Sequence, residues 1–339
     1  MKNLKITSIL LVLILMFTLV ACGQSNDNKG NDIVNTNNST DNPTNNPTET
    51  PTDTQEDNVD IGDEVITTYP TTIIDSFDRE VNIEEEPKKI ISLSPSITEI
   101  VYALGQSDKL IGRTDYCDYP QEVADIQSIG SLTDPNIEKI VELEPDIVIA
   151  SAHFKEEVLQ KLEELDVKVA ILYGEENFDG AYEAIEKVGN ILNAQRKASD
   201  IVDNMKATVA DVVQKVEGQE KPNVYYVVGF GEYGDFTAGG DTFIGQLIEM
   251  AGAKNAADDV EGWSYSLEKL VENNPDYLIC SKNDKHKEQL ITVNGYMDLD
   301  AVINDKVYEI DKNMIERQGP RLADGLKEIA QYIHPNAFE

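Results

Sequence analysis

The amino-acid sequence predicts an α/β protein with two pseudo-symmetric lobes, mostly parallel sheets and a long connecting helix. The first observation behind this prediction is an internal duplication. Residues 137–151 (IEKIVELEPDIVIAS) and 267–281 (LEKLVENNPDYLICS) are identical at eight of fifteen positions, at an offset of 130 residues. Each copy is typical of a short helix that a proline ends, followed by an apolar strand. A continuous apolar run suits a parallel strand covered on both faces.

The second observation is the alternation of apolar runs with amphipathic segments in both halves, which predicts parallel sheets. In the first half we expect a helix that begins at the capping box Ser96-Ile-Thr-Glu99 and ends at Gly105. The other expected elements are strands at 89–93, 167–172, 223–228 and 306–310 and helices at 154–165 and 241–251.

The third observation concerns residues 179–218, which contain no proline and whose apolar residues recur at spacings of three and four. This pattern predicts a stiff helical connector, which Gly189 interrupts and divides into two helices. Ligands of open α/β sheets bind beyond the carboxyl ends of the strands. Two such lobes that face each other would therefore form a ligand cleft between them.

The N-terminus is typical of an export signal. Lys2 and Lys5 precede an apolar run at 6–20 that is short for a membrane span. The residues Leu19-Val20-Ala21-Cys22 look like a lipobox, so we interpret residues 1–21 as a lipoprotein signal peptide. Diacylated Cys22 would anchor the exported protein to the outer face of the cell membrane. A plain signal peptide that happens to contain Cys22 is the alternative.

The next segment, residues 22–66 with the lipidated cysteine, is predicted to be a disordered acidic tether. Residues 24–66 contain no aromatic residue, ten acidic residues and one lysine, a composition that cannot bury enough apolar surface to fold. Beyond it we assign residues 67–178 to an N-terminal lobe, 179–218 to the connecting helix and 219–339 to a C-terminal lobe.

The charge of the folded part excludes some functions. The chain carries −35, to which the signal contributes +2 and the tether −9, which leaves −28 for residues 67–339. Such a charge argues against a nucleic-acid partner and against an anionic ligand held by bulk charge. Cys117 and Cys280 are too few for a disulfide framework, and the duplication places them in different lobes. We expect both to be small buried hydrophobic residues.

With these features in place, residues 86 to about 335 resemble the helical-backbone class (class III) of ABC substrate-binding proteins, which serves cobalamin, haem and iron–siderophore importers. Three of the phrases that carry the resemblance look most like the vitamin B12-binding members: Tyr116-x-Asp118-Tyr119-Pro120, Gly262-Trp263 and Glu316-Arg-x-x-Pro-Arg321. The other phrases are Ile90-Ile-Ser-Leu-Ser-Pro-Ser-Ile-Thr-Glu99, Gly112-Arg-Thr-Asp, Ile137-Glu138 with Pro145-Asp146, and Phe236-Thr-Ala-Gly-Gly240.

This resemblance implies a ligand site. Tyr116, Phe236 and Trp263 match aromatic residues that line the corrin site, and Arg317 matches an arginine at the same cleft. Rigid aromatic side chains suit a broad, mostly apolar disc. His153 and Phe154 closely follow Ser151, where the family has a tryptophan, and they complete the set of expected ligand residues.

The sequence also departs from the family pattern. Two further tryptophans of the corrin site fall on Leu132 and Ser151, and an aspartate near the arginine falls on Asn313. These departures concern the choice of ligand and leave the expected fold unchanged.

Glu138 and Glu268 are equivalent in the duplication, each at the start of its helix. In the family that the chain resembles, one glutamate on each lobe docks onto arginines of the permease dimer in the membrane. A glutamate in a first helical turn is also favoured by the helix dipole. Both roles are compatible, and the symmetry favours docking.

We therefore expect a monomeric solute-binding protein of an ABC importer that captures a corrinoid. Haem or an iron–siderophore complex is the alternative, with Tyr116 or His153 as an axial ligand for haem. A lipid-anchored enzyme on the same scaffold is a third hypothesis. The sequence contains no Gly-x-Ser-x-Gly, Walker A or dinucleotide-binding motif and only three histidines. We thus expect no enzymatic activity, resident cofactor or protein-bound metal.

Overall fold

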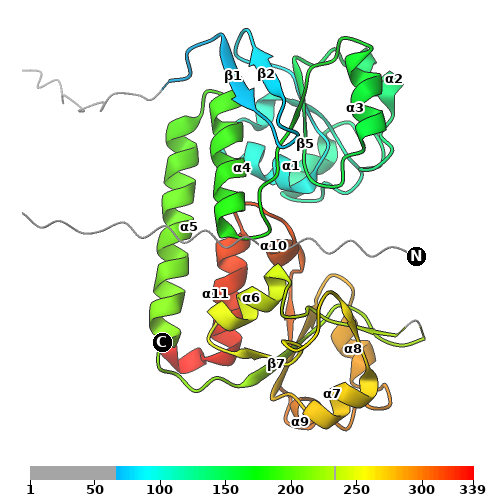
Figure 1. The fold of residues 1–339 in the computed structure, drawn as a ribbon, viewed down its shortest axis with the longest axis vertical. Coiled ribbons are helices and arrows are strands. Elements are labelled where there is room, and N and C mark those ends of the chain that lie inside the picture. The colour runs from blue at the N-terminus through cyan, green and yellow to red at the C-terminus, as the bar shows by residue number, and fades with distance from the viewer. Residues whose placement is uncertain (1–65, 233) are drawn as a thin grey trace, which may run out of the picture. The chain divides into compact units, whose positions relative to one another are not determined.

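The computed structural model describes residues 66–232 and 234–339, which belong to one compact unit. The predicted signal peptide, the lipidation site Cys22 and the tether up to residue 65 lie outside the described residues. Figure 1 shows two α/β lobes with long helices running alongside them.

Each lobe is built on a four-stranded parallel sheet with the same topology. The first has the order β4–β3–β5–β6 and the second β9–β7–β11–β12. The strands are β3 (Ile90–Ser92), β4 (Leu110–Arg113), β5 (Ile147–Ala150), β6 (Val169–Ile171), β7 (Asn223–Val227), β9 (Lys254–Asn255), β11 (Tyr277–Ser281) and β12 (Val307–Ile310). The two copies of the repeat form β5 and β11, which are the third strand of each sheet. The predicted pseudo-symmetric α/β fold is confirmed.

Side chains alternate between two cores along each central strand, as strand geometry requires. In β5, Ile147 and Ile149 enter a core shared with the long helices, while Val148 and Ala150 enter a separate core of the first lobe. In β11, Ile279 faces the shared core and Leu278 the core of the second lobe. Burial on both faces explains why these strands are continuous apolar runs.

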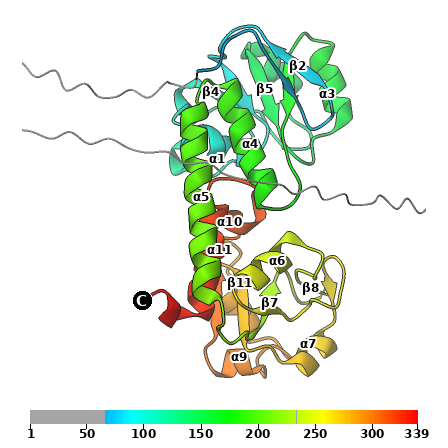
Figure 2. The same cartoon turned by 60° about the vertical axis from the view of Figure 1, so that its left-hand side comes forward.

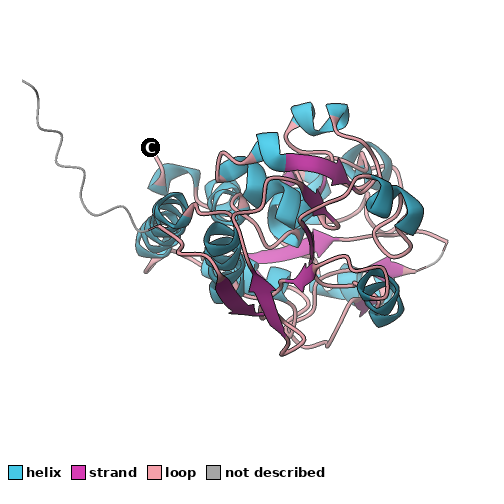
Figure 3. Cartoon of the chain, turned by 90° about the horizontal axis from the view of Figure 1, so that it is seen from above, coloured by secondary structure: helices cyan, strands magenta, loops and turns pink. Residues whose placement is uncertain are grey.

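Helices cover both faces of the sheets, as the view from above shows (Figure 3). They are α1 (Pro95–Ala103), α2 (Ile137–Glu142), α3 (Glu156–Glu163), α4 (Phe178–Ile191), α5 (Gln195–Val216), α6 (Phe243–Met250), α7 (Leu267–Asn273), α8 (His286–Leu290), α9 (Asp300–Ile303), α10 (Asn313–Glu316) and α11 (Leu322–Ile333). Two short antiparallel pairs complete the fold: β1 (Thr71–Ile74) with β2 (Glu80–Ile83), and β8 (Asp235–Phe236) with β10 (Ser264–Tyr265).

The connector between the lobes is a helical hairpin in which α5 passes beside both lobes (Figures 1 and 2). The sequence predicted a break between the two helices at Gly189. The structure places the break at residues 192–194. Gly189 remains helical and allows close packing. An ideal Cβ at this position would lie 2.5 Å from the Cβ of Ala198 on α5.

Helix α1 also begins earlier than predicted. Pro95 is its first residue and Ser94 its N-cap, without a side-chain cap hydrogen bond. Ser96 is a buried residue inside the helix and Glu99 makes no capping contact. Proline at the first helical position is pre-organised for helix initiation, which explains why the capping-box interpretation was wrong.

Cys117 and Cys280 are free and buried, as predicted. Among the described residues, no helix has both the length and the apolar character needed to cross a membrane.

Candidate functional site

A pocket with a volume of about 640 Å³ lies where the carboxyl ends of several strands meet. Ser94 follows β3, Ser151 follows β5, Tyr173 follows β6 and Val228 follows β7, so both lobes contribute to the lining. The volume lies within the range of roughly 300–1,000 Å³ that is typical of small-molecule sites. The predicted position of the ligand cleft agrees with this pocket.

The second lobe supplies an apolar wall to the pocket, formed by Trp263, Phe243 and Ile244. The backbone fixes the position of Trp263. Its carbonyl oxygen accepts a hydrogen bond from the Thr237 N–H at 2.9 Å, and the preceding Gly262 N–H donates to Asp241 Oδ1 at 2.7 Å. Trp263 is 45 % exposed, so much of its indole surface is available to a ligand.

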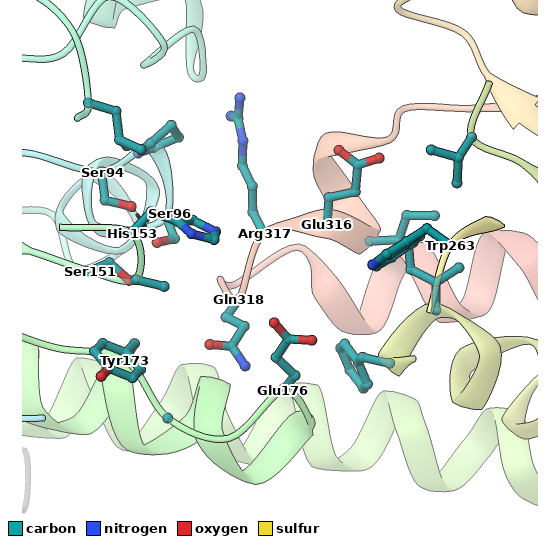
Figure 4. A pocket seen from close by; sticks show the side chains of 18 residues that line it. Ser94, Ser96, Ser151, His153, Tyr173, Glu176, Trp263, Glu316, Arg317 and Gln318 are labelled. Carbon is teal, nitrogen blue, oxygen red and sulfur yellow. Dashed lines mark hydrogen bonds between the residues drawn. The ribbon is translucent and has the colours of Figure 1, made fainter. Parts of the chain in front are cut away.

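The first lobe supplies a polar wall of hydroxyl groups and one imidazole. Ser94 Oγ and Ser96 Oγ lie 2.9 Å apart at the start of α1. Ser151 and His153 follow β5, and His153 has a positive φ of 66°. Histidine is among the side chains that tolerate this left-handed conformation best. Figure 4 shows these four residues on the opposite side of the pocket from Trp263.

Arg317 lines the pocket, but its guanidinium group is already paired. Nη1 donates to Glu99 Oε1 at 2.8 Å and to Asp118 Oδ1 at 2.7 Å, and Nη2 donates to the Tyr116 carbonyl at 3.4 Å. In Figure 4 its side chain extends away from Trp263. Arg317 therefore links the second lobe to the first, and its charge is neutralised by two carboxylates.

Glu99 is the centre of this network. Its side chain is only 2 % exposed, and it also accepts hydrogen bonds from Arg321 Nε at 2.7 Å and Arg321 Nη2 at 2.8 Å. Arg321 Nη1 pairs with Asp311 Oδ2 at 2.9 Å, and its guanidinium carbon lies 3.9 Å from the centre of the Tyr119 ring. Burial alone would lower the pKa of Arg321, but the contacts with Glu99 and Asp311 outweigh burial and raise it.

The structure brings three of the predicted ligand residues together: His153, Trp263 and Arg317 all line the pocket. Leu132 and Ser151, the positions of the missing tryptophans, line it as well. Both side chains are smaller than tryptophan, so they leave room that indole rings would fill.

The other three predicted ligand residues lie outside the pocket lining. Phe154 is buried in the core of the first lobe. Tyr116 is 59 % exposed, and only its carbonyl contacts Arg317. Phe236 pairs through its backbone with Ser264 in β10, and its ring lies beside Gly229. Their assignment to the site stays a prediction that this arrangement does not support.

Four further residues of the lining were not predicted from the sequence: Tyr173, Glu176, Glu316 and Gln318. Glu316 and Gln318 flank Arg317, so the motif that identified the arginine also contained them. Tyr173 and Glu176 come from the segment between β6 and α4, where no motif marked them.

Glu138 and Glu268 lie in the first turns of α2 and α7. The N-cap residues of these helices, Asn136 and Ser266, are exposed. Both glutamates are exposed, and neither joins an ion pair within the described part of the chain. Each helix precedes its strand through a link of three or four residues, so its N-terminus lies at the carboxyl end of the sheet. The two glutamates therefore lie at the edge of each lobe where the pocket opens.

Within residues 66–232 and 234–339, no group of three histidine, cysteine, aspartate or glutamate side chains is arranged to hold a metal ion.

Comparisons with known proteins agree with this geometry. The model of a family described as periplasmic binding protein matches residues 90–314. An uncharacterised ABC transporter substrate-binding lipoprotein of Bacillus subtilis is 34 % identical over 278 residues, with 80 % of this chain and 88 % of the relative covered. A cobalamin-binding protein of Halobacterium salinarum is 25 % identical over 280 residues, with 79 % and 75 % covered.

Among solved structures, a possible iron-binding, periplasmic solute-binding protein of Staphylococcus epidermidis superposes with a TM-score of 0.64 at 30 % identity. The match covers 74 % of this chain and all of that one.

Proposed function

The chain belongs to the periplasmic binding protein family and is an ABC transporter substrate-binding protein of the vitamin B12, haem and iron–siderophore type; from this premise we propose that it captures a corrinoid. The observation that carries the proposal is the pocket with an indole wall opposite a wall of hydroxyl groups. A flat apolar face of a corrin would stack on Trp263. The amide arms of its rim would form hydrogen bonds with the seryl groups.

Haem or an iron–siderophore complex is the alternative ligand. His153 is the observation that favours it, because its exposed imidazole faces the pocket and could occupy an axial position of a metal chelate. The function proposed here is capture and delivery to a permease dimer by a monomer, without catalysis and without a resident cofactor.

The test is retention of a coloured ligand. The folded domain is incubated separately with cyanocobalamin, haem and a ferric siderophore, and the absorption spectrum of the protein peak is recorded after gel filtration. We expect the corrinoid spectrum to co-elute at a one-to-one ratio. Retention of haem or of the ferric complex in its place would contradict the corrinoid assignment.

Trp263 gives a specific signal for the same event, because it is the only tryptophan of the chain. We expect saturating cyanocobalamin to quench its fluorescence, and Trp263→Ala to weaken binding by about 1–3 kcal/mol, the range for a buried apolar side chain. Ile303→Ala, at an exposed position at the end of α9, is the control and should bind normally. Unchanged emission at saturation would place the indole outside the ligand site.

Lipid anchoring at Cys22 is also part of the proposal. Cys22→Ala should release the protein from the membrane fraction or leave the signal uncleaved, because no thiol remains at the lipobox for acylation. Cys280→Ala, which removes a buried thiol, should leave anchoring unchanged. The measurement is detergent partitioning of whole cells, and a processed Cys22→Ala variant that still partitions fully into detergent would disprove the anchor.

A further inference from the structure

Two carboxylates line the pocket without forming an ion pair with another described residue. Glu176 lies just before α4 and Glu316 ends α10, and neither side chain takes part in an ion pair among the residues that the structure describes. Figure 4 shows both glutamates among the residues that line the pocket. Desolvation by the surrounding protein raises the pKa of Glu316 and outweighs the opposite effect of the charges on Lys312 and Arg317, although the Glu316 side chain keeps contact with solvent in the cleft.

The cationic side chain of the pocket lining is already paired with carboxylates. Arg317 is the only lysine or arginine among the residues that line this pocket, and it already faces Glu99 and Asp118. An anionic group that entered the pocket would have to compete with these two carboxylates for the guanidinium. Taking the arginine from buried Glu99 would leave that carboxylate without its full compensation, which is costly.

We infer that this pocket selects its ligand by charge: it accepts neutral or cationic metal chelates whose rim carries hydrogen-bond donors, and it rejects anionic ones. The inference rests on the proposed function, because it concerns the ligand of the same cleft. Glu176 and Glu316 accept hydrogen bonds from donors such as primary amides and ammonium groups. They repel carboxylates and catecholate oxygens that approach the pocket.

This rule divides the candidate ligands by their chemistry. Corrinoids with amide arms, and ferric trihydroxamates that carry an ammonium group, satisfy it. Haem, with two propionates, and trianionic ferric triscatecholates violate it. The overall charge of −28 on residues 67–339 acts in the same direction at long range.

The sharpest probe changes one charge on one ligand. Cyanocobalamin is compared with its monocarboxylic acid derivative, in which hydrolysis of one peripheral amide replaces a donor by an anion of nearly equal size. We expect the acid to bind at least about tenfold more weakly, which corresponds to a modest electrostatic penalty in a partly solvated site. The difference should shrink at high salt, because mobile ions screen the repulsion.

The matched variants test whether the two pocket carboxylates are responsible. Glu176→Gln with Glu316→Gln should reduce the preference for the amide form to within about twofold, because both repulsive charges are gone. Glu164→Gln with Glu288→Gln changes the net charge equally at two exposed positions, the C-cap of α3 and a residue of α8, and should keep the preference. Titrations of the unmodified domain and of both double variants with the two ligands, at low and at high salt, give the dissociation constants that are compared.

The outcomes separate this inference from the corrinoid assignment. If the domain binds a cationic ferric trihydroxamate and neither cyanocobalamin nor the anionic chelates, the charge rule stands and the assignment fails. If it binds cyanocobalamin and the acid derivative equally, the assignment stands and the charge rule is wrong. Tight binding of haem or of a ferric triscatecholate would also overturn the charge rule.

Discussion

Glu99→Ala is expected to lower the free energy of unfolding by about 3–5 kcal/mol, the cost of leaving a buried ionic partner uncompensated. Glu99 accepts hydrogen bonds from both Arg317 and Arg321, which are 218 and 222 residues away in the chain. The side chains of both arginines are only 14 % exposed. Removing the carboxylate therefore leaves two poorly solvated arginines, of which Arg317 keeps only Asp118 and Arg321 keeps only Asp311 as an acidic partner.

Urea unfolding measures this loss, with the midpoint and the slope compared to the unmodified protein. Asp118→Ala is the matched control, because it removes the other acidic partner of Arg317 from a side chain that is 56 % exposed. An exposed pair contributes roughly 0–1 kcal/mol, so this variant should be nearly neutral. Glu99→Gln keeps the volume and should reproduce most of the loss. A loss as small as that of Asp118→Ala would show that the buried carboxylate does not stabilise the contact between the lobes.

The network also predicts the direction of a pH effect. Burial alone would raise the pKa of Asp311, but hydrogen bonds from Arg321 and the Asn313 N–H outweigh it and hold the pKa below its ordinary value. A carboxyl group whose pKa is lower in the folded state stabilises the fold at pH values above its pKa in the unfolded chain, which is about 4. This contribution is lost as the pH falls below that value through the lowered folded pKa.

Much of the fold could be predicted from the sequence because the repeat and the apolar strand pattern both reflect a central strand that is buried on both faces. A strand buried on both faces is apolar at most of its positions, and the repeat placed two such strands in equivalent positions. The β1–β2 hairpin was missed. Its strands have four residues each, and its turn is held by hydrogen bonds from backbone N–H groups to the side chain of Asp75.

The site was predicted only in part, because local motifs do not specify the partners of a side chain. The phrase around Trp263 sits in a loop, and the structure places it at the pocket as expected. Arg317 also lies there, but its pairing with Glu99 spans 218 residues and no local pattern encodes it. Phe154 directly follows the pocket residue His153, yet its side chain turns into the core because the chain bends at His153.

The second large effect concerns transport. Glu138→Ala combined with Glu268→Ala should leave the affinity for the ligand in solution nearly unchanged and reduce uptake by at least about tenfold, because charge steering changes association rates by roughly 10–10³. Both glutamates are exposed in the first turns of equivalent helices and lie outside the pocket lining. One acidic side chain on each lobe would allow the protein to engage a two-fold symmetric permease through both lobes.

The repeat supplies a matched control in the same two helices. Glu142 and Glu272 are also equivalent at the offset of 130, are exposed, and lie in the last turns of α2 and α7. Glu142→Ala with Glu272→Ala removes the same charge from the same helices at their opposite ends, so uptake should remain close to normal. This pair separates a specific docking role from the overall negative charge.

The two measurements are ligand titration of the soluble domain and ligand-stimulated ATPase activity or uptake with the cognate permease in vesicles. Higher salt should weaken docking of the unmodified protein more than docking of the Glu138/Glu268 double variant, because screening removes an attraction that the variant no longer has. Normal uptake by that variant would reduce both glutamates to residues that favour helix initiation through the dipole. A large loss of ligand affinity would instead place them at the ligand site, and the assignment of the cleft edge as the docking surface would be wrong.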